Sequence, residues 1–252
     1  MKVLAIAAVT LREALRRKVQ VNLLLFGLFM VAASYAISTL TLGEMHRVIS
    51  DIGLSSMTAV GSLLAAFLGS GSIAGDLERR TVHSIAAKPV ARAEYVIGRY
   101  AGLSVALILN LAVMATALGT ILALDARSAS VLDVPFFAAV ALLGVQLLIV
   151  AAVAILFSAL TSTTLAAIFT LAVTVAGQLS NDMLNLWRTG GVWVAKLVWY
   201  ALPNLGALNL NEAVIYHDAI PPAVWFRGLY GLLYAAASVA LACLLFERRD
   251  FR

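Results

Sequence analysis

Long apolar runs separated by short charged stretches set the pattern of this chain. Six runs are long enough to cross about 30 Å of hydrocarbon as helices, and they lie at about residues 21–42, 54–75, 98–124, 135–160, 165–180 and 224–246. No internal repeat, low-complexity tract or soluble domain interrupts them. The pattern therefore predicts an all-α integral membrane protein with six transmembrane helices, forming a single transmembrane domain over residues 1–252.

The first residues, 1–19, have the pattern of an amphipathic helix. At about 100° per residue the apolar side chains share one face, and the opposite face carries Lys2, Arg12, Glu13, Arg16 and Arg17. This arrangement is typical of a helix that lies in the membrane interface, although a cytosolic helical extension would have a similar sequence. Because no small-residue cleavage site follows, a cleaved signal peptide is not expected.

The segment between the fifth and sixth runs, residues 181–222, mixes aromatic and charged residues. It also contains the helix breakers Gly190, Gly191, Pro203, Pro221 and Pro222. Since its tryptophans suit the lipid headgroup level, we expect short or re-entrant helices on the outer face. A seventh full span is the alternative, but it would move the basic C-terminus to the outer side, against the distribution of charge.

Composition supports the membrane assignment, and the positions of the charges give an orientation. Hydrophobic residues make up 62% of the 252 residues and charged ones 12%, against about 25% charged in a typical soluble domain. With six spans, thirteen of the 18 lysines and arginines fall on one side and five on the other. Because basic residues concentrate in cytoplasmic loops, both termini are predicted to be cytoplasmic. Topology thus explains the net charge of +5, with no need for a nucleic-acid partner.

Few residues are suited to catalysis, metal binding or ion transport. The three histidines, His46, His83 and His217, are expected in loops, and the lone cysteine, Cys243, lies in an apolar run. No pair of them has the spacing of metal ligands. We therefore expect a non-catalytic subunit without catalytic, cofactor or metal sites. Ionisable residues lie in loops or near span ends, so no ion relay is expected, and transport would need a driving force from a partner. Three neutral polar residues lie within the spans, Asn110, Gln146 and Gln178. We expect them to form hydrogen bonds between helices, and the alternative is that they line a transport pathway.

Glycines near the end of the second run raise the possibility of a phosphate-binding loop. Gly69, Gly71 and Ala74 fit a loose dinucleotide pattern, but that fingerprint needs a preceding strand, and here an apolar helix precedes. Small residues four positions apart let helices approach closely in lipid. We therefore predict that Gly71 and Gly75 serve helix packing.

The segment 76–97 after the second run is too long and too regular for a simple turn. Its first part is amphipathic, Pro89 interrupts it, and a second short helix is expected to lead into the third span. Such a segment could dock a cytosolic partner. It could equally be an interfacial helix held on anionic lipid by basic side chains, and the pattern alone leaves both open.

The residues of this loop resemble those of permease subunits of ABC-type exporters, the six-span class that includes drug, polysaccharide and nitrous-oxide-reductase maturation transporters. The matching positions are Glu78, Arg80, Thr81, Pro89, Arg92, Gly98 and Arg99, the last standing where lysine is commoner. Weaker similarities lie at residues 202–209 and 244–251. The resemblance extends over the whole chain, whereas its specific motif covers about 25 residues.

This resemblance implies a multi-pass subunit of a prokaryotic cytoplasmic (inner) membrane, driven by two cytosolic ATPase subunits that bind ATP and Mg²⁺. The coupling interface with the ATPase would consist of Glu78, Arg80, Thr81, Pro89 and Arg92, with residues 158–164 as a lesser contact. The export pathway would lie at a dimer interface, lined by the first, second and fifth spans. The partner would be a second copy or a homologous permease. A membrane scaffold or assembly factor that recruits a non-ATPase partner is the alternative.

Overall fold

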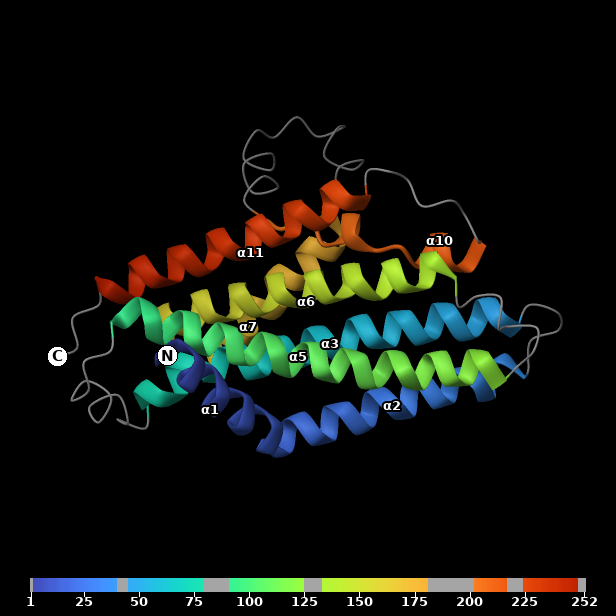
Figure 1. Ribbon diagram of the computed structural model, residues 1–252, viewed down its shortest axis with the longest axis horizontal. Helices are drawn as coiled ribbons and strands as arrows, with labels where there is room; N and C mark the ends of the chain where they lie inside the picture. The colour runs from blue at the N-terminus through green and yellow to red at the C-terminus, as the bar shows by residue number, and fades with distance from the viewer. Residues whose placement is uncertain are drawn as a thin grey trace.

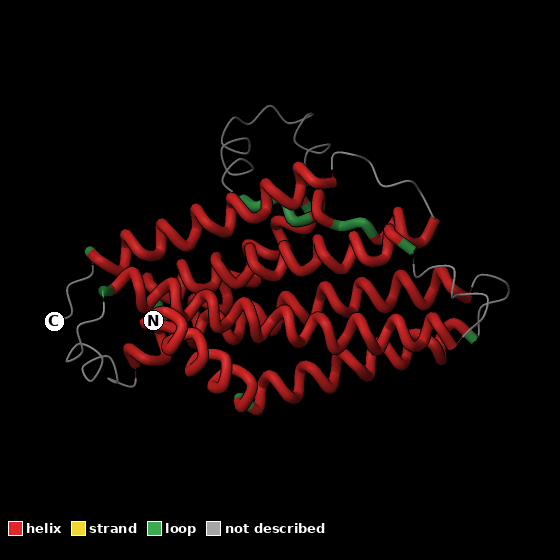
Figure 2. Tube along the Cα trace, viewed as in Figure 1, coloured by secondary structure: helices red, strands yellow, loops and turns green. Residues whose placement is uncertain are grey.

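The computed structural model describes residues 2–39, 45–78, 91–124, 133–180, 202–216 and 224–248. Throughout these ranges the chain forms helices and their connections, with no strand (Figures 1 and 2). The helices are α1 Lys2–Arg16, α2 Lys18–Ser38, α3 Met45–Glu78, α5 Arg92–Leu124, α6 Val134–Leu160, α7 Thr163–Gln178, the 3-10 helix η2 Gly206–Leu208, α10 Asn211–Tyr216 and α11 Val224–Glu247. The predicted all-α class is confirmed.

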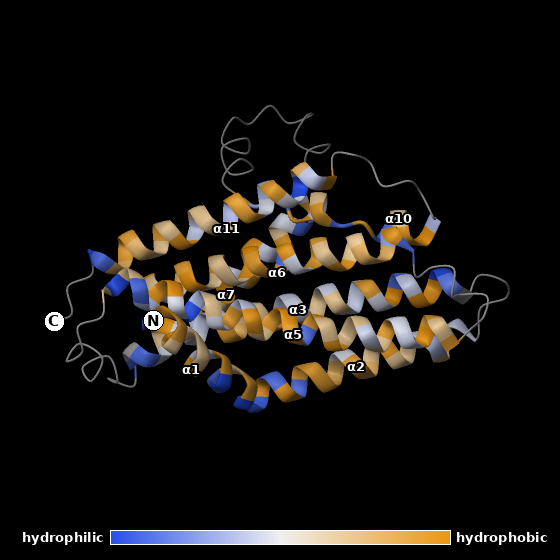
Figure 3. Cartoon of the chain, viewed as in Figure 1, coloured by the Kyte–Doolittle hydropathy of each residue, from blue (hydrophilic) through white to orange (hydrophobic). Residues whose placement is uncertain are grey.

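Five described helices, α2, α3, α5, α6 and α11, are long and apolar enough to cross a membrane (Figure 3). The fifth predicted run is α7, an apolar helix of only 16 residues, which at 1.5 Å per residue is about 24 Å long and shorter than the hydrocarbon layer. After α7 the chain returns along its end, where the Leu205 amide donates to the Gly177 carbonyl over 3.1 Å. The structure thus has five long candidate spans and one short apolar helix.

Two helices continue well beyond their apolar runs. α3 has 34 residues and α5 has 33, about 50 Å each at 1.5 Å per residue. His46, expected in a loop, lies in the first turn of α3. The short helix expected before the third span is the first part of a continuous α5. Polar first turns lack the apolar periodicity that marks a span, which is why both starts were placed too late.

The N-terminal helix is separate from the first span, as expected. Arg17 has extended backbone angles, φ −70° and ψ 127°, which break the helix between α1 and α2. α1 packs chiefly against the first half of α5, at Gly98 and Gly102. A Cβ on Gly98 would lie 2.8 Å from Ile6 Cβ, and one on Gly102 would overlap the Ala7 carbonyl oxygen. This glycine pair is what lets α1 lie close against α5.

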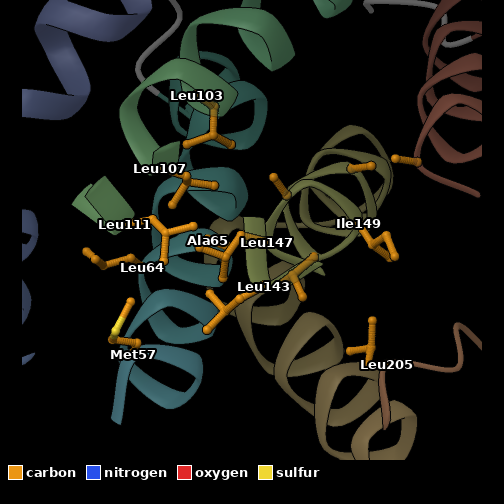
Figure 4. Close-up of a cluster of buried hydrophobic side chains, with 14 of the residues drawn as sticks. Met57, Leu64, Ala65, Leu103, Leu107, Leu111, Leu143, Leu147, Ile149 and Leu205 are labelled. Carbon is orange, nitrogen blue, oxygen red and sulfur yellow. The ribbon is translucent and has the colours of Figure 1, made fainter. Parts of the chain in front are cut away.

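The core is centred on α3 and α6, which pack against each other along most of their length (Figure 4). Small residues of α3 face α6: a Cβ on Gly61 would lie 2.9 Å from the Leu147 side chain, and one on Gly69 would overlap Ala154. Lipid tails are as apolar as leucine, so close van der Waals packing, more than expulsion of water, holds such helices together.

The described part of the segment between α7 and α11, residues 202–216, covers the end of the bundle where α10 lies (Figure 1). Leu205, Leu208 and Val214 are buried there, against α6, α11 and α3. The rest of the segment expected to form outer helices, at 181–201 and 217–222, lies outside the described residues.

Candidate functional site

Several helices begin or end at one end of the bundle, which we call the loop end. Here α1 begins, α3 ends, α5 begins, α6 passes into α7, and α11 ends (Figure 1). Residues 79–90, which join α3 to α5, start and finish at this end but lie outside the described residues. The side chains that flank them are described, and they form three clusters.

The first cluster joins α1, α3 and α5 around the buried side chain of Arg99, which is 9% exposed. Its Nη1 lies 2.6 Å from Glu13 Oε2, and its Nη2 pairs with Asp76 Oδ2. The Arg99 Nε donates to the Tyr95 hydroxyl oxygen over 3.2 Å, and that hydroxyl donates to Asp76. One guanidinium therefore connects residues from three helices.

This cluster is close to neutral, which is what its burial requires. A buried charge is tolerated only when it is paired and hydrogen-bonded. Arg17 supplies a second positive charge, with its Nη2 3.8 Å from Glu13 Oε1 and 3.5 Å from the Gly71 carbonyl oxygen. Because a planar guanidinium presents several donors in a fixed fork, arginine at position 99 can reach both carboxylates at once.

The second cluster fastens the turn between α6 and α7 to the last two turns of α3. The Ser158 hydroxyl accepts hydrogen bonds from the amides of Ile73 (3.1 Å) and Ala74 (2.9 Å). It donates to the Ser70 carbonyl over 2.6 Å. A side chain inserted into the hydrogen-bond ladder of a helix in this way is a known cause of local bending. Ser158 of α6 therefore contacts α3 at a point where α3 can bend.

Glu78, the last residue of α3, completes the second cluster. Its Oε1 accepts a hydrogen bond from the amide of Thr163, the first residue of α7, over 3.0 Å. The N-cap residue Ser162 makes no side-chain cap bond of its own. The first amides of a helix lack partners within it and favour a negative charge nearby. Glu78 therefore caps α7 from a different helix.

The third cluster fastens the start of α5 to the end of α11. Arg92 Nη1 donates to the Glu247 carbonyl over 2.8 Å, at a helix C-terminus where a positive charge is favoured. The ring of Tyr95 stacks on Phe246 with 6.0 Å between centroids. The helix ends on either side of 79–90 are thus attached to different helices, α3 through Glu78 to α7 and α5 through Arg92 to α11.

The predicted site residues are distributed as follows. Glu78 and Arg92 have the contacts just given, whereas the other three proposed coupling residues lie outside the described residues: Arg80, Thr81 and Pro89. Gly71 faces Arg17, and a Cβ there would lie 2.6 Å from the arginine Nη1. Gly75 lies beside Thr163, whose Oγ1 would be 4.0 Å from an added Cβ.

Several contacts of the site were not anticipated from the sequence. They are the links that Glu13, Asp76, Tyr95 and Ser158 make between helices, and the packing of α1 on Gly98 and Gly102. The glycine spacing and the charges beside apolar runs were visible signals. An interhelical bond was expected for Asn110, and the bond that its Nδ2 makes is to the Ala106 carbonyl of its own helix. Gln146 Nε2 is buried without a described partner.

A cavity of about 490 Å³ lies between α3 and α7, far from the loop end. Hydroxyl, amide and apolar side chains line it, among them Ser55, Thr58, Ser62, Thr174 and Gln178. Ser62 is 6% exposed, and its Oγ has no hydrogen-bond partner among the described residues. No charged side chain is among the residues that line this cavity. Its volume falls within the range of about 300–1,000 Å³ that is usual for ligand sites.

Within the described ranges, no three histidine, cysteine, aspartate or glutamate residues come together in a way that could hold a metal ion. The charged side chains of the three clusters bond to one another and to backbone amides and carbonyls. These bonds attach the helices to one another at the loop end.

Comparison with known proteins agrees with this description. No curated protein matches the chain. The model of the ABC-2 family transporter proteins matches residues 4–251, nearly the entire sequence. The chain belongs to this family and is the membrane component of an ABC transporter, a multi-pass membrane protein.

Proposed function

We propose that this ABC-2 family member is an export permease that works as a dimer and is driven by two cytosolic ATPase subunits. The ATPases bind ATP and Mg²⁺, and residues 79–90 with their flanks receive the movement that follows hydrolysis. The second permease is another copy or a homologous chain. The observation that carries the proposal is that both flanks of this segment are attached to other helices, Glu78 to α7 and Arg92 to α11.

Attachment of this kind suits energy coupling. An ATPase that closes beneath the membrane can move spans only through elements that transmit a push without yielding. α3 and α5 continue beyond the thickness of the hydrocarbon, and the Arg99 cluster joins them to α1. A displacement of residues 79–90 would then reach α1, α7 and α11 together.

The charge distribution supports a cytoplasmic location for the loop end in a prokaryotic inner membrane. Many described basic residues belong to α1, the start of α2, the start of α5 or the end of α11: Lys2, Arg12, Arg16, Arg17, Lys18, Arg92, Arg99 and Arg248. The opposite half has Arg47 and Arg227. Cytoplasmic segments carry the excess of lysine and arginine.

The cavity between α3 and α7 supports the predicted role of the second and fifth spans in the pathway. The hydroxyl and amide side chains among its lining residues carry no charge and could offer hydrogen bonds to a passing substrate.

Copurification tests this function. The tagged chain is co-expressed with each ATP-binding-cassette ATPase of its own genome, and the membrane extract is purified on the tag. We expect one ATPase to copurify at one ATPase per permease chain and to hydrolyse ATP. Failure to recover any ATPase with the wild-type chain would refute the proposal and favour the scaffold alternative.

A further inference from the structure

We infer that Glu78 is the positioning residue that makes α7 follow the movement of α3, by capping the start of α7. The inference rests on the proposed function, because it states how movement at residues 79–90 reaches a helix that lines the cavity. It assigns to Glu78 an intramolecular role within the chain. That role is separate from any contact of Glu78 with an ATPase.

The contacts between α3 and the turn before α7 are arranged in series along α3. Ser158 bonds to the backbone at residues 70, 73 and 74. Gly75 follows directly and leaves room beside Thr163, the first residue of α7. At the end of α3, Glu78 accepts a hydrogen bond from the Thr163 amide. The Ser158 bonds hold the end of α6, whereas the bond to Glu78 is made by α7 itself.

α7 depends on this bond more than a longer helix would. It has 16 residues and no side-chain cap from Ser162, and much of it is exposed, including Leu165, Ile168 and Val175. Its far end is held by the return of the chain, where Leu205 bonds to Gly177. A helix attached to other segments at its two ends changes its tilt when one attachment moves.

The tilt of α7 matters because its second half lines the cavity opposite α3. Leu171, Thr174, Val175 and Gln178 face residues 55–63 of α3 across that space. If Glu78 carries the start of α7 along with α3, movement at the loop end shifts both walls of this cavity together. If the bond is absent, α3 can move while α7 lags behind.

The chain offers a matched pair of substitutions that isolate the bond. Thr163→Pro removes the amide donor, and proline is well tolerated at the first position of a helix. The preceding Ser162 has φ −71° and ψ 160°, which is the conformation that a residue before proline prefers. Thr163→Ala is the control, because it keeps the amide and changes only the side chain. Glu78→Ala removes the acceptor, and Glu78→Gln keeps an acceptor without the charge.

Hydrogen exchange on the purified chain in nanodiscs tests the bond without any partner. We expect the Thr163 amide to exchange at least about tenfold faster in Glu78→Ala than in the wild type, since a bond to a charged group is lost. Glu78→Gln should give an intermediate rate. Equal rates in the wild type and Glu78→Ala would overturn the inference, whatever the outcome of the ATPase copurification.

Distance measurement on the ATPase complex tests the transmission. With Cys243 replaced by alanine, spin labels are placed at exposed positions of α3 and α7, Phe67 and Ile168. In the wild type and Thr163→Ala we expect one narrow distance that ATP leaves unchanged. In Thr163→Pro the distance should broaden and shift with ATP, while ATP hydrolysis continues, and in Glu78→Ala it should broaden and shift in the same way. Narrow, ATP-independent distances in both variants would refute the inference.

Discussion

Replacement of Arg99 tests the cluster that joins α1, α3 and α5. Its side chain is 9% exposed and pairs with Asp76, which is 13% exposed, and with Glu13, which is 37% exposed. Arg99→Ala removes the positive charge that pairs with the buried carboxylate of Asp76. Breaking a buried pair by removing one member typically costs about 3–5 kcal/mol, and we expect a loss of that order.

The two carboxylates should contribute unequally because their exposures differ. Removal of the more exposed Glu13 should cost only about 0.2–1 kcal/mol, the range for solvent-accessible pairs. Arg99→Lys should be intermediate, because a single ammonium cannot reach both carboxylates in the way that the guanidinium fork does. The double replacement Asp76→Leu with Arg99→Leu should regain much of the loss, since a packed apolar pair can replace a buried ion pair.

Reversible unfolding of the purified chain by increasing SDS in mild detergent, followed by circular dichroism, gives these free energies. Glu13→Ala is the internal control for a charge removed from the same cluster. Equal losses below about 1 kcal/mol for Arg99→Ala and Glu13→Ala would show that Arg99 is solvated, and would refute the description of this cluster as a buried ionic link.

Three further predictions follow from individual contacts. Gly102→Leu should displace α1 from α5, because a Cβ would overlap the Ala7 carbonyl. Limited proteolysis should then release residues 1–17 faster than in the wild type, and an unchanged cleavage rate would argue against this packing. Ser158→Ala should lower the free energy of unfolding by about 1–3 kcal/mol, since two amides of α3 lose their acceptor. Ser62→Ala, which removes a hydroxyl without a partner among the described residues, should be neutral in the same unfolding assay. A larger loss for Ser62→Ala than for Ser158→Ala would contradict this description. Arg92→Ala removes an exposed bond to α11, so stability should change by less than about 1 kcal/mol. The difference in ATP hydrolysis between the ATPase alone and the ATPase with the permease should become smaller. An unchanged difference would remove Arg92 from the coupling role.

The sequence could predict the apolar helices because a run of some twenty apolar residues has few alternatives in a membrane. It could not predict how far α3 and α5 extend, since their polar ends have no strong periodicity. The run at 165–180 has the same 16 residues as α7, so its length was visible in the sequence, and counting it as a full span was the error.

The links at the loop end were beyond the reach of sequence patterns. Ser158 bonds to residues 84 to 88 positions away, and Glu13 meets Arg99 across 86 positions. Nothing in the local sequence of either partner specifies the other. The resemblance to ABC exporters singled out Glu78 and Arg92, but only the fold attaches one to α7 and the other to α11.

Photo-crosslinking from residues 79–90 tests the central claim most directly, namely that this segment docks the ATPase. A photoreactive phenylalanine analogue is placed at Thr81 and, as the control, at Asp133, an exposed residue at the start of α6, and the membranes containing both proteins are irradiated. We predict an adduct between the permease and the ATPase from Thr81 and none from Asp133. An adduct from Asp133 with none from Thr81 would contradict the account.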